Sequence, residues 1–326
     1  MHQKRILLSA ALSVCLLLAL LALQIPLYTA SSVAEEPTVQ TEANAQRRIT
    51  RFLVMGCDKS KKLTDSIFVV TLDEDRREAS ILQIPRDTYA EYTTRDYKKL
   101  NGAKSALGEK GVKDFLSRAL GVPIQYFFVL DLDILRNVVD SIGGVDVEIP
   151  QQMIYSDPIQ GLEINLQEGY AHLDGSMAEQ FVRYRAGYPN ADLGRLDAQK
   201  SFLRAFAKKC RGLTLSQLLP LTANLIVGVQ TDVGLCEAIR VVSLLKECNA
   251  DNIPMETLAG QALQGSSGAW YYAVNREGAL RQVNQYLLPN TPVGLERFDP
   301  EGVLDREDFI KFHAIYTAPE GELPLE

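Results

Sequence analysis

The strongest constraint on the fold comes from residues 65–72, DSIFVVTL, which are almost continuously apolar and rich in β-branched side chains. Such a run is typical of a strand that is buried on both faces. The charged segment DEDRRE (residues 73–78) follows it, and a second apolar run, ASILQIP (residues 79–85), comes next. This pattern predicts a β-hairpin. A hairpin covered on both faces requires further layers packed against its sheet.

Strand and helix patterns alternate along the rest of the chain without internal repeats. The alternation predicts a layered α/β domain, an α/β/α arrangement in which helices flank a central mixed β-sheet. Because no linker rich in Pro, Gly or Ser divides it, we expect one domain over residues 50–289. Further strands are predicted at residues 52–56, 125–131, 145–150, 164–169, 255–259 and 269–275, and helices at residues 112–121, 134–142, 175–181, 192–212, 215–227, 236–248 and 276–288.

An uncharged apolar run over residues 6–23 lies near the N-terminus, and basic residues stand on its short N-terminal side. The run is long enough to cross a bilayer, and the basic residues predict an inside N-terminus and an outside body. A cleaved signal peptide is the alternative, but the run exceeds the usual apolar core of such peptides. We therefore expect residues 1–28 to form a cytoplasmic stub and one transmembrane helix, and residues 29–49 an extracellular tether.

Charge is unevenly distributed along the chain. The formal net charge is −7, and residues 290–326 hold three basic and nine acidic side chains, a balance of −6. We interpret this segment as an acidic C-terminal tail. The remainder is close to neutral, which argues against a nucleic-acid-binding protein with a broad basic face. Any anion-binding site must therefore be local.

The cysteines give little guidance on function. Cys57, Cys210, Cys236 and Cys248 lie outside the N-terminal apolar run, and their spacing matches no zinc-binding pattern. With only three histidines in the chain, a metal site built from soft ligands is disfavoured. The four cysteines allow three pairings, and both buried thiols and one disulfide stay open.

Charged residues gather at one end of the predicted hairpin. If its turn centres on Asp75 and Arg76, strand pairing sets Asp65 opposite Arg86, within a residue or two. The loop before Asp65 contains Asp58, which therefore lies at the same edge. A strand end rich in charge is a usual place for a functional site. Capping of the loop by these carboxylates is the structural alternative.

Two arginines, Arg183 and Arg185, stand two residues apart where a predicted helix gives way to Gly and Pro. Residues two apart on an extended chain share a face, so both guanidiniums are expected to face one cleft. Val182 and Tyr184 would then pack inward.

A third arginine, Arg195, stands four residues before Gln199 on the next predicted helix, so the two share a face. Asp192 is the expected N-cap of that helix. A helix N-terminus offers N–H groups and partial positive charge, which suit a phosphate. Arginines flanking a helix-turn-helix can also simply cover a surface; the charged hairpin edge favours a site.

Several segments resemble, in order and spacing, the LytR-CpsA-Psr family of bacterial cell-envelope enzymes. The resemblance implies a membrane-anchored, outward-facing phosphotransferase. Such an enzyme moves an anionic or capsular glycopolymer from an undecaprenyl pyrophosphate carrier, its donor, to a peptidoglycan sugar hydroxyl, its acceptor, with Mg²⁺ as cofactor. The segments are GCDKSKKLTDSIFVVTLD, ILQIPRDTY, KLNGAKS, GGVDVEIP, LDGSMAEQFVRYR and DLGRLDAQKSFL.

The resemblance also implies roles for individual residues. Asp58 and Asp65 would hold the Mg²⁺, which usually takes one or two carboxylates and completes its shell with water and phosphate. Arginine forks would neutralise the charge that spreads during phosphoryl transfer, and Gln199 would assist them. The pyrophosphate-binding arginines would be Arg86, Arg183, Arg185 and Arg195.

Lysines replace arginines at two places. The family commonly has an arginine just after the first aspartate and another before the second, where this chain has Lys59 and Lys62. Lysine keeps the charge but loses the bidentate fork. We group Lys99 and Asn101 with the substrate-binding residues as well, with solvent exposure or a helix cap as the alternative.

The general base and the lipid groove are less defined. Asp87 or one of the metal-site aspartates could accept the proton of the acceptor hydroxyl. YFFVL (residues 126–130) and LLPLTANLIV (residues 218–227) could line a groove for the isoprenoid, although such segments are more often core. Two other functions stay open, namely a polyprenyl-pyrophosphate hydrolase and a non-catalytic envelope scaffold or regulator that binds polyprenyl lipids.

Overall fold

A computed structural model describes residues 47–57, 62–92, 98–158, 161–188, 192–248, 253–264, 269–294 and 298. Within these ranges no helix is both long and apolar enough to cross a bilayer. The predicted N-terminal anchor and nearly all of the predicted tether and acidic tail lie outside the described residues. The boundaries proposed for them stay predictions.

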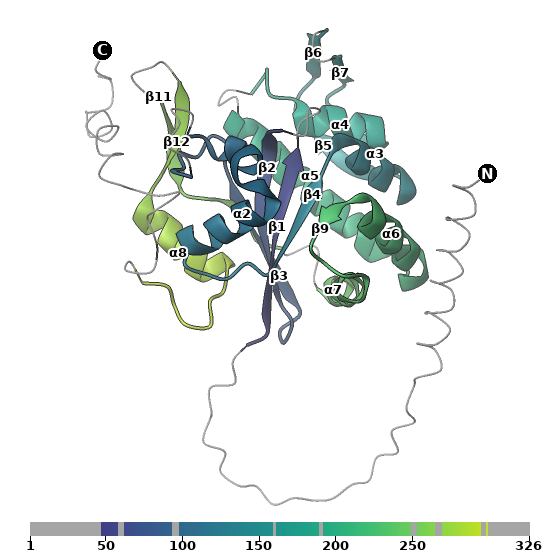
Figure 1. Cartoon of the computed structure of the whole chain (residues 1–326). Helices are drawn as coiled ribbons and strands as arrows, with labels where there is room; N and C mark the ends of the chain where they lie inside the picture. Colours follow the sequence, from purple (N-terminus) through teal and green to yellow (C-terminus); the bar gives the residue numbers. More distant parts are fainter. Residues whose placement is uncertain are drawn as a thin grey trace, which may run out of the picture. The chain divides into compact units, whose positions relative to one another are not determined.

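A six-stranded mixed sheet forms the centre of the fold (Figure 1), with the strand order β10-β3-β2-β1-β4-β9. The pairs β1–β4 and β10–β3 run parallel, and the other neighbours run antiparallel. This confirms the predicted central mixed sheet. The strands span Ile49–Cys57 (β1), Thr64–Asp73 (β2), Glu78–Ile84 (β3), Tyr126–Leu130 (β4), Gln230–Thr231 (β9) and Met255–Thr257 (β10).

The predicted hairpin is formed by β2 and β3. Asp73 pairs with Glu78 at the turn, and Ile67 pairs with Ile84 near the far end. The Asp73 carboxylate accepts hydrogen bonds from the backbone N–H groups of Asp75 (3.1 Å) and Arg76 (3.0 Å), which closes the turn. Continued by two residues, this register sets residue 65 opposite residue 86, as predicted.

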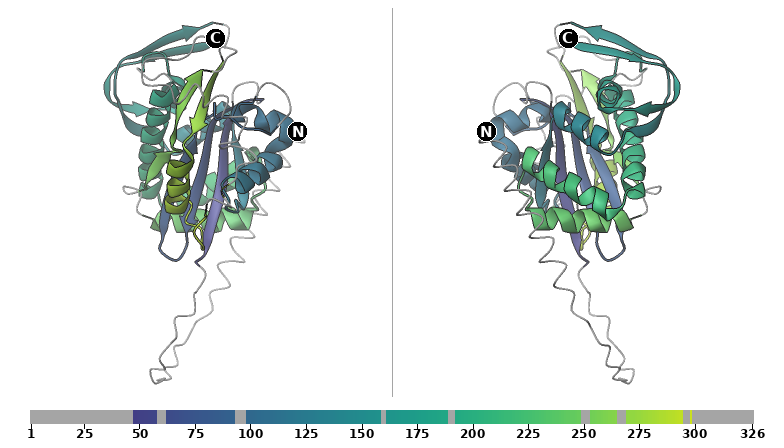
Figure 2. Two further views of the ribbon diagram at one scale, coloured as in Figure 1. Left: turned by 90° about the vertical axis from the view of Figure 1, so that its left-hand side faces the viewer. Right: turned by 90° about the vertical axis from the view of Figure 1, so that its right-hand side faces the viewer.

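Helices cover both faces of the sheet (Figure 2). Alternate residues of a strand point to opposite faces, and β1 illustrates the consequence. Leu53 and Met55 pack in one cluster with α2 and α8, whereas Phe52 packs in another with α7. The predicted α/β/α layering is therefore confirmed. The helices of the fold are α2 (Ala103–Ala119), α3 (Leu132–Ser141), α4 (Gly175–Arg183), α5 (Asp192–Gly212), α6 (Leu215–Gly228), α7 (Leu235–Glu247) and α8 (Arg276–Tyr286), with a short 3-10 turn η1 (Leu100–Gly102).

Two antiparallel strand pairs form an arm beside the sheet (Figure 1). β5 (Val145–Ile149) pairs with β8 (Gly169–Leu173), and β6 (Met153–Asp157) pairs with β7 (Leu162–Leu166). The buried face of this arm joins a second core with residues of α3, α4 and α5. The strands β5 and β7 match predicted ones, whereas β6 and β8 were not predicted. A third pair, β11 (Gly260–Gln264) with β12 (Trp270–Val274), packs near α8.

A buried arginine fastens the start of β1 to the end of α8. The Arg51 guanidinium donates hydrogen bonds to the backbone carbonyls of Leu287 (2.6 Å), Leu288 (3.0 Å) and Pro123 (3.2 Å). Burial, together with the nearby charge of Arg47, lowers the pKa of Arg51 to about 10. The side chain therefore stays charged near neutral pH, and the three carbonyls compensate its burial.

Candidate active site

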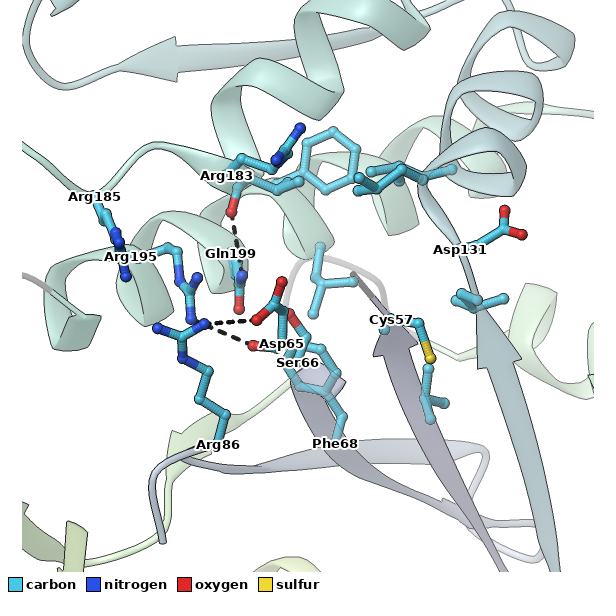
Figure 3. A pocket seen from close by; sticks show the side chains of 18 of the residues that line it. Cys57, Asp65, Ser66, Phe68, Arg86, Asp131, Arg183, Arg185, Arg195 and Gln199 are labelled. Carbon is cyan, nitrogen blue, oxygen red and sulfur yellow. Dashed lines mark hydrogen bonds and ion pairs between the residues drawn. The ribbon is translucent and has the colours of Figure 1, made fainter. Parts of the chain in front are cut away.

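A pocket of about 500 Å³ lies at the edge of the sheet where β1, β3 and β4 end and β2 begins (Figure 3). Its walls come from the sheet, from α3, α4 and α5, and from the β6–β7 pair of the arm. Most of its lining is apolar, and its charged groups gather mainly on one side. The apolar lining comprises Val54, Leu63, Phe68, Val70, Ile81, Leu130, Leu132, Leu135, Tyr155, Leu162, Val182, Phe202 and Leu203.

Asp65 is the centre of the charged side. Arg86 Nη1 donates to Asp65 Oδ1 at 2.6 Å, and Arg195 Nη2 donates to the backbone carbonyl of Asp65 at 3.3 Å. Arg195 is buried, and the Asp65 side chain is 37% exposed. The predicted contact between Asp65 and Arg86 is therefore confirmed, and Arg195 also contacts Asp65.

The arginine pair of residues 183 and 185 reaches the same pocket from the end of α4. Tyr184 has extended backbone (φ −62°, ψ 134°) and is buried, as predicted for this exit. Arg185 is exposed, and Arg183 Nη1 donates to Glu179 Oε1 at 2.9 Å. Val182 departs from the prediction, because it is only half-buried and lines the pocket.

Two hydrogen bonds of its side-chain amide hold Gln199 in place. Gln83 Nε2 of β3 donates to Gln199 Oε1 at 3.0 Å, and Gln199 Nε2 donates to the carbonyl of Val182 at 3.2 Å. Gln199 is buried and lies in the pocket lining. These hydrogen bonds link α5 to the sheet and to the end of α4, and so fix the place of one polar group relative to the arginines.

Other predicted site residues lie elsewhere. Lys99 Nζ pairs with Asp87 Oδ1 at 3.0 Å and lies over the Tyr271 ring, and neither residue lines the pocket. Asn101 is buried, and its backbone N–H donates to the carbonyl of Arg86 (2.9 Å), which makes it a support for the site. Lys62 is exposed outside the lining. Asp58 and Lys59 lie outside the described residues.

Asp131 and Glu179 were not predicted as site residues, although each carries a local sequence signal. Asp131 lines the pocket and caps α3, accepting a hydrogen bond from the Ile134 N–H at 2.8 Å. An Asp that ends a strand and directly precedes a helix predicts an N-cap. Glu179 stands four residues before Arg183, a helical spacing that predicts an ion pair. Of the two segments considered for a lipid groove, residues 126–130 contribute Leu130 to the pocket, and residues 218–222 contribute nothing to its lining.

The sequence matches the model of the LytR_cpsA_psr family over residues 27–287. Among curated proteins, the polyisoprenyl-teichoic acid–peptidoglycan teichoic acid transferase TagV of Bacillus subtilis is 25% identical over 284 residues, covering 82% of this chain and 73% of that protein. The transferase TagU of Bacillus mycoides, which carries the same functional description, is 26% identical over 241 residues, covering 72% of this chain and 77% of its own.

Solved structures share the fold. The crystal structure of B. subtilis TagV superimposes with a TM-score of 0.64 at 24% identity, covering 78% of this chain and 98% of that one. A Streptococcus agalactiae protein gives a TM-score of 0.68 at 19% identity, covering 81% and 95%. TagT bound to LIIa-WTA gives 0.61 at 21% identity, covering 77% and 95%. These likenesses show the fold, and the family match, which spans most of the chain, shows that the protein belongs to the LytR-CpsA-Psr family.

Proposed function

We propose that this protein is a cell-envelope phosphotransferase that moves a glycopolymer from a polyprenyl-pyrophosphate carrier to a peptidoglycan sugar hydroxyl. The observation that carries the proposal is that one pocket of about 500 Å³ combines a largely apolar wall with four arginines in its lining. An isoprenoid pyrophosphate combines an apolar tail with a strongly anionic head. Curated relatives act on teichoic acid and peptidoglycan, as their names state.

The chemistry is a phosphoryl transfer. The acceptor hydroxyl oxygen forms a bond to the phosphorus next to the glycan, and the bond from that phosphorus to the bridging oxygen breaks. The polyprenyl phosphate leaves with the bond electrons, and the hydroxyl proton passes to a base. Arginine forks suit the negative charge that develops on the phosphoryl oxygens, and Arg86 and Arg195 are already held together around Asp65.

The base is best sought among the carboxylates of the pocket. Asp87 is paired with Lys99 outside the lining. Asp65 lies within the pocket beside the arginines and keeps a third of its side chain exposed, so an acceptor hydroxyl or a water can reach it. We therefore propose Asp65, rather than Asp87, as the nearer candidate for proton transfer.

The proposed cofactor is Mg²⁺. No cluster of three or more His, Cys, Asp or Glu side chains suited to a metal occurs in the part of the chain that the structure describes. Mg²⁺ does not need such a cluster, since it takes one or two carboxylates with water and phosphate oxygens. The partly exposed carboxylate of Asp65 fits that donor set, and Asp58 would be the second ligand. When bound, the ion would neutralise charge on the pyrophosphate.

We further propose that the predicted N-terminal helix holds the protein in the cell membrane with this domain outside. The proposal rests on the apolar run and on the basic residues before it. It would bring the pocket to the compartment in which both a lipid-linked donor and peptidoglycan are found.

Incubation of the full chain in detergent with Mg²⁺, a polyprenyl-pyrophosphate-linked glycan and peptidoglycan tests the proposed function. We expect glycan to become covalently bound to peptidoglycan and polyprenyl phosphate to be released. Arg195→Met should abolish this transfer, whereas Arg204→Met, which removes an exposed arginine from the same helix, should not. Release of free glycan phosphate in the presence of peptidoglycan would instead indicate a hydrolase. Unchanged transfer by Arg195→Met would contradict the assigned site.

A further inference from the structure

A buried carboxylate next to the pocket is shared by two arginines. Glu179 of α4 is only 6% exposed. Its Oε1 accepts a hydrogen bond from Arg183, and its Oε2 accepts one from Arg136 of α3. Arg136 also pairs with Asp133, on its own helix. Each oxygen of Glu179 thus has its own guanidinium, and one of the two belongs to an arginine of the pocket lining.

Close packing of α3 and α4 produces this arrangement. A Cβ atom at Gly175 would lie 2.4 Å from the carbonyl oxygen of Arg136, so only glycine permits the contact. The Gly175 N–H donates to Asp140 Oδ1 at 2.7 Å, which ties the first turn of α4 to α3. One turn later along α4, Glu179 meets the Arg136 side chain, and one further turn brings Arg183.

The guanidinium of Arg183 is turned away from the other phosphate-binding candidates. In Figure 3 it points away from Arg86, Arg195 and Asp65. The Arg183 side chain is 15% exposed, so its pairing with Glu179 takes place largely out of water. Oriented in this way, the Arg183 guanidinium has to swing away from Glu179 to reach an anion bound near Arg86.

This exchange of Glu179 for the anion would ordinarily be costly, because removal of one partner leaves a buried charge uncompensated. Here Arg136 would remain on the carboxylate after Arg183 has left. We propose that Glu179 and Arg136 are positioning residues for Arg183. Glu179 holds its guanidinium away from the site, and Arg136 compensates Glu179 when the pyrophosphate of the donor takes Arg183. The inference rests on the proposed function, since it concerns the same pyrophosphate site.

The test is the affinity of the full chain for farnesyl pyrophosphate, measured by calorimetry in detergent. Glu179→Gln is expected to tighten binding roughly fivefold, because Arg183 is no longer held by a charged partner. Arg136→Met is expected to weaken binding by a similar factor, because Glu179 is left buried and alone in the bound state. If the two residues had a purely structural role, both variants would bind the probe more weakly. Tighter binding by Glu179→Gln together with weaker binding by Arg136→Met would therefore support the exchange.

Each change is repeated in an Arg183→Ala background, where both effects should shrink below twofold. Asp133→Asn, which removes the exposed second partner of Arg136, is the matched control for loss of a nearby negative charge. The inference is overturned if Glu179→Gln weakens binding, if both effects persist without Arg183, or if Asp133→Asn tightens binding equally. Should Glu179→Gln fail to fold, Arg136→Met tests the exchange alone, and unchanged affinity would overturn it.

Arg86→Ala separates this inference from the proposed function. If Arg86→Ala loses binding, the assigned pyrophosphate site is supported and the proposed function stands. If, in addition, the effect of Glu179→Gln is the same with and without Arg183, the inference alone is overturned. Failure of the unaltered protein to bind the probe overturns both.

Discussion

Replacement of Arg86 by methionine should remove activity without unfolding the protein. Arg86 donates to Asp65 at 2.6 Å, and its side chain is 17% exposed. The partner carboxylate is 37% exposed, so water can solvate it once the arginine is gone. A pair of this kind contributes about 0–1 kcal/mol to stability, and methionine retains much of the apolar stem. The midpoint of thermal unfolding should therefore fall by no more than about 2–4 °C.

The expected loss of activity is much larger. A donor aimed at charge that develops in the transition state contributes about 2.7–4 kcal/mol, which corresponds to a fall in turnover of roughly 10²–10³-fold. Arg86→Lys keeps the charge but not the fork, so it should recover only part of the rate. The assay is kcat/KM for glycan transfer, with calorimetry of each variant. Arg118→Met, at an exposed position of α2, is the control. A loss below about fivefold, or one that follows the loss of folded protein, would refute the reasoning.

Three other predictions concern the pocket wall, pH and the thiols. Leu135→Trp narrows the apolar part of the pocket, so transfer from long polyprenyl donors should fall at least about tenfold; equal rates would contradict a lipid site there. Burial raises the pKa of Glu74, but hydrogen bonds from Arg240 and another side chain outweigh it and lower the pKa overall. The difference in free energy of unfolding between the unaltered protein and Glu74→Gln, measured with urea, should therefore narrow as pH falls from about 5 to 3. A difference that stays constant would contradict the lowered pKa of Glu74. Burial raises the pKa of Cys210 to about 11, so iodoacetamide at pH 8 should label the exposed Cys236 first by mass spectrometry; equal labelling would argue against it.

The pairing of Asp65 with Arg86 could be predicted by counting residues outward from the hairpin turn, because a short turn fixes the register of two antiparallel strands. The layered fold followed from alternation of strand and helix patterns for a similar reason, since those patterns are local. Glu179 carried a local signal too, its helical spacing from Arg183, which was overlooked.

Other features depend on contacts between distant segments. The pairing of Arg136 with Glu179 joins residues 43 positions apart through the packing of α3 on α4. The pocket wall formed by Tyr155 and Leu162 belongs to short strands on either side of a turn. Nothing in the sequence near these residues indicates which distant side chain they meet. The same holds for the Asp87–Lys99 pair, which removes a predicted base from the pocket.

The contact of Arg51 with Leu287 and Leu288 has a practical consequence for handling the protein. The chain enters the described fold at the start of β1, and α8 ends beside that point. The pocket lies at the other end of β1, at Gly56 and Cys57, about 20 Å away at the rise of an extended strand. Protein immobilised on a bead through its N-terminal side would therefore present an open pocket, which even an insoluble sacculus could approach.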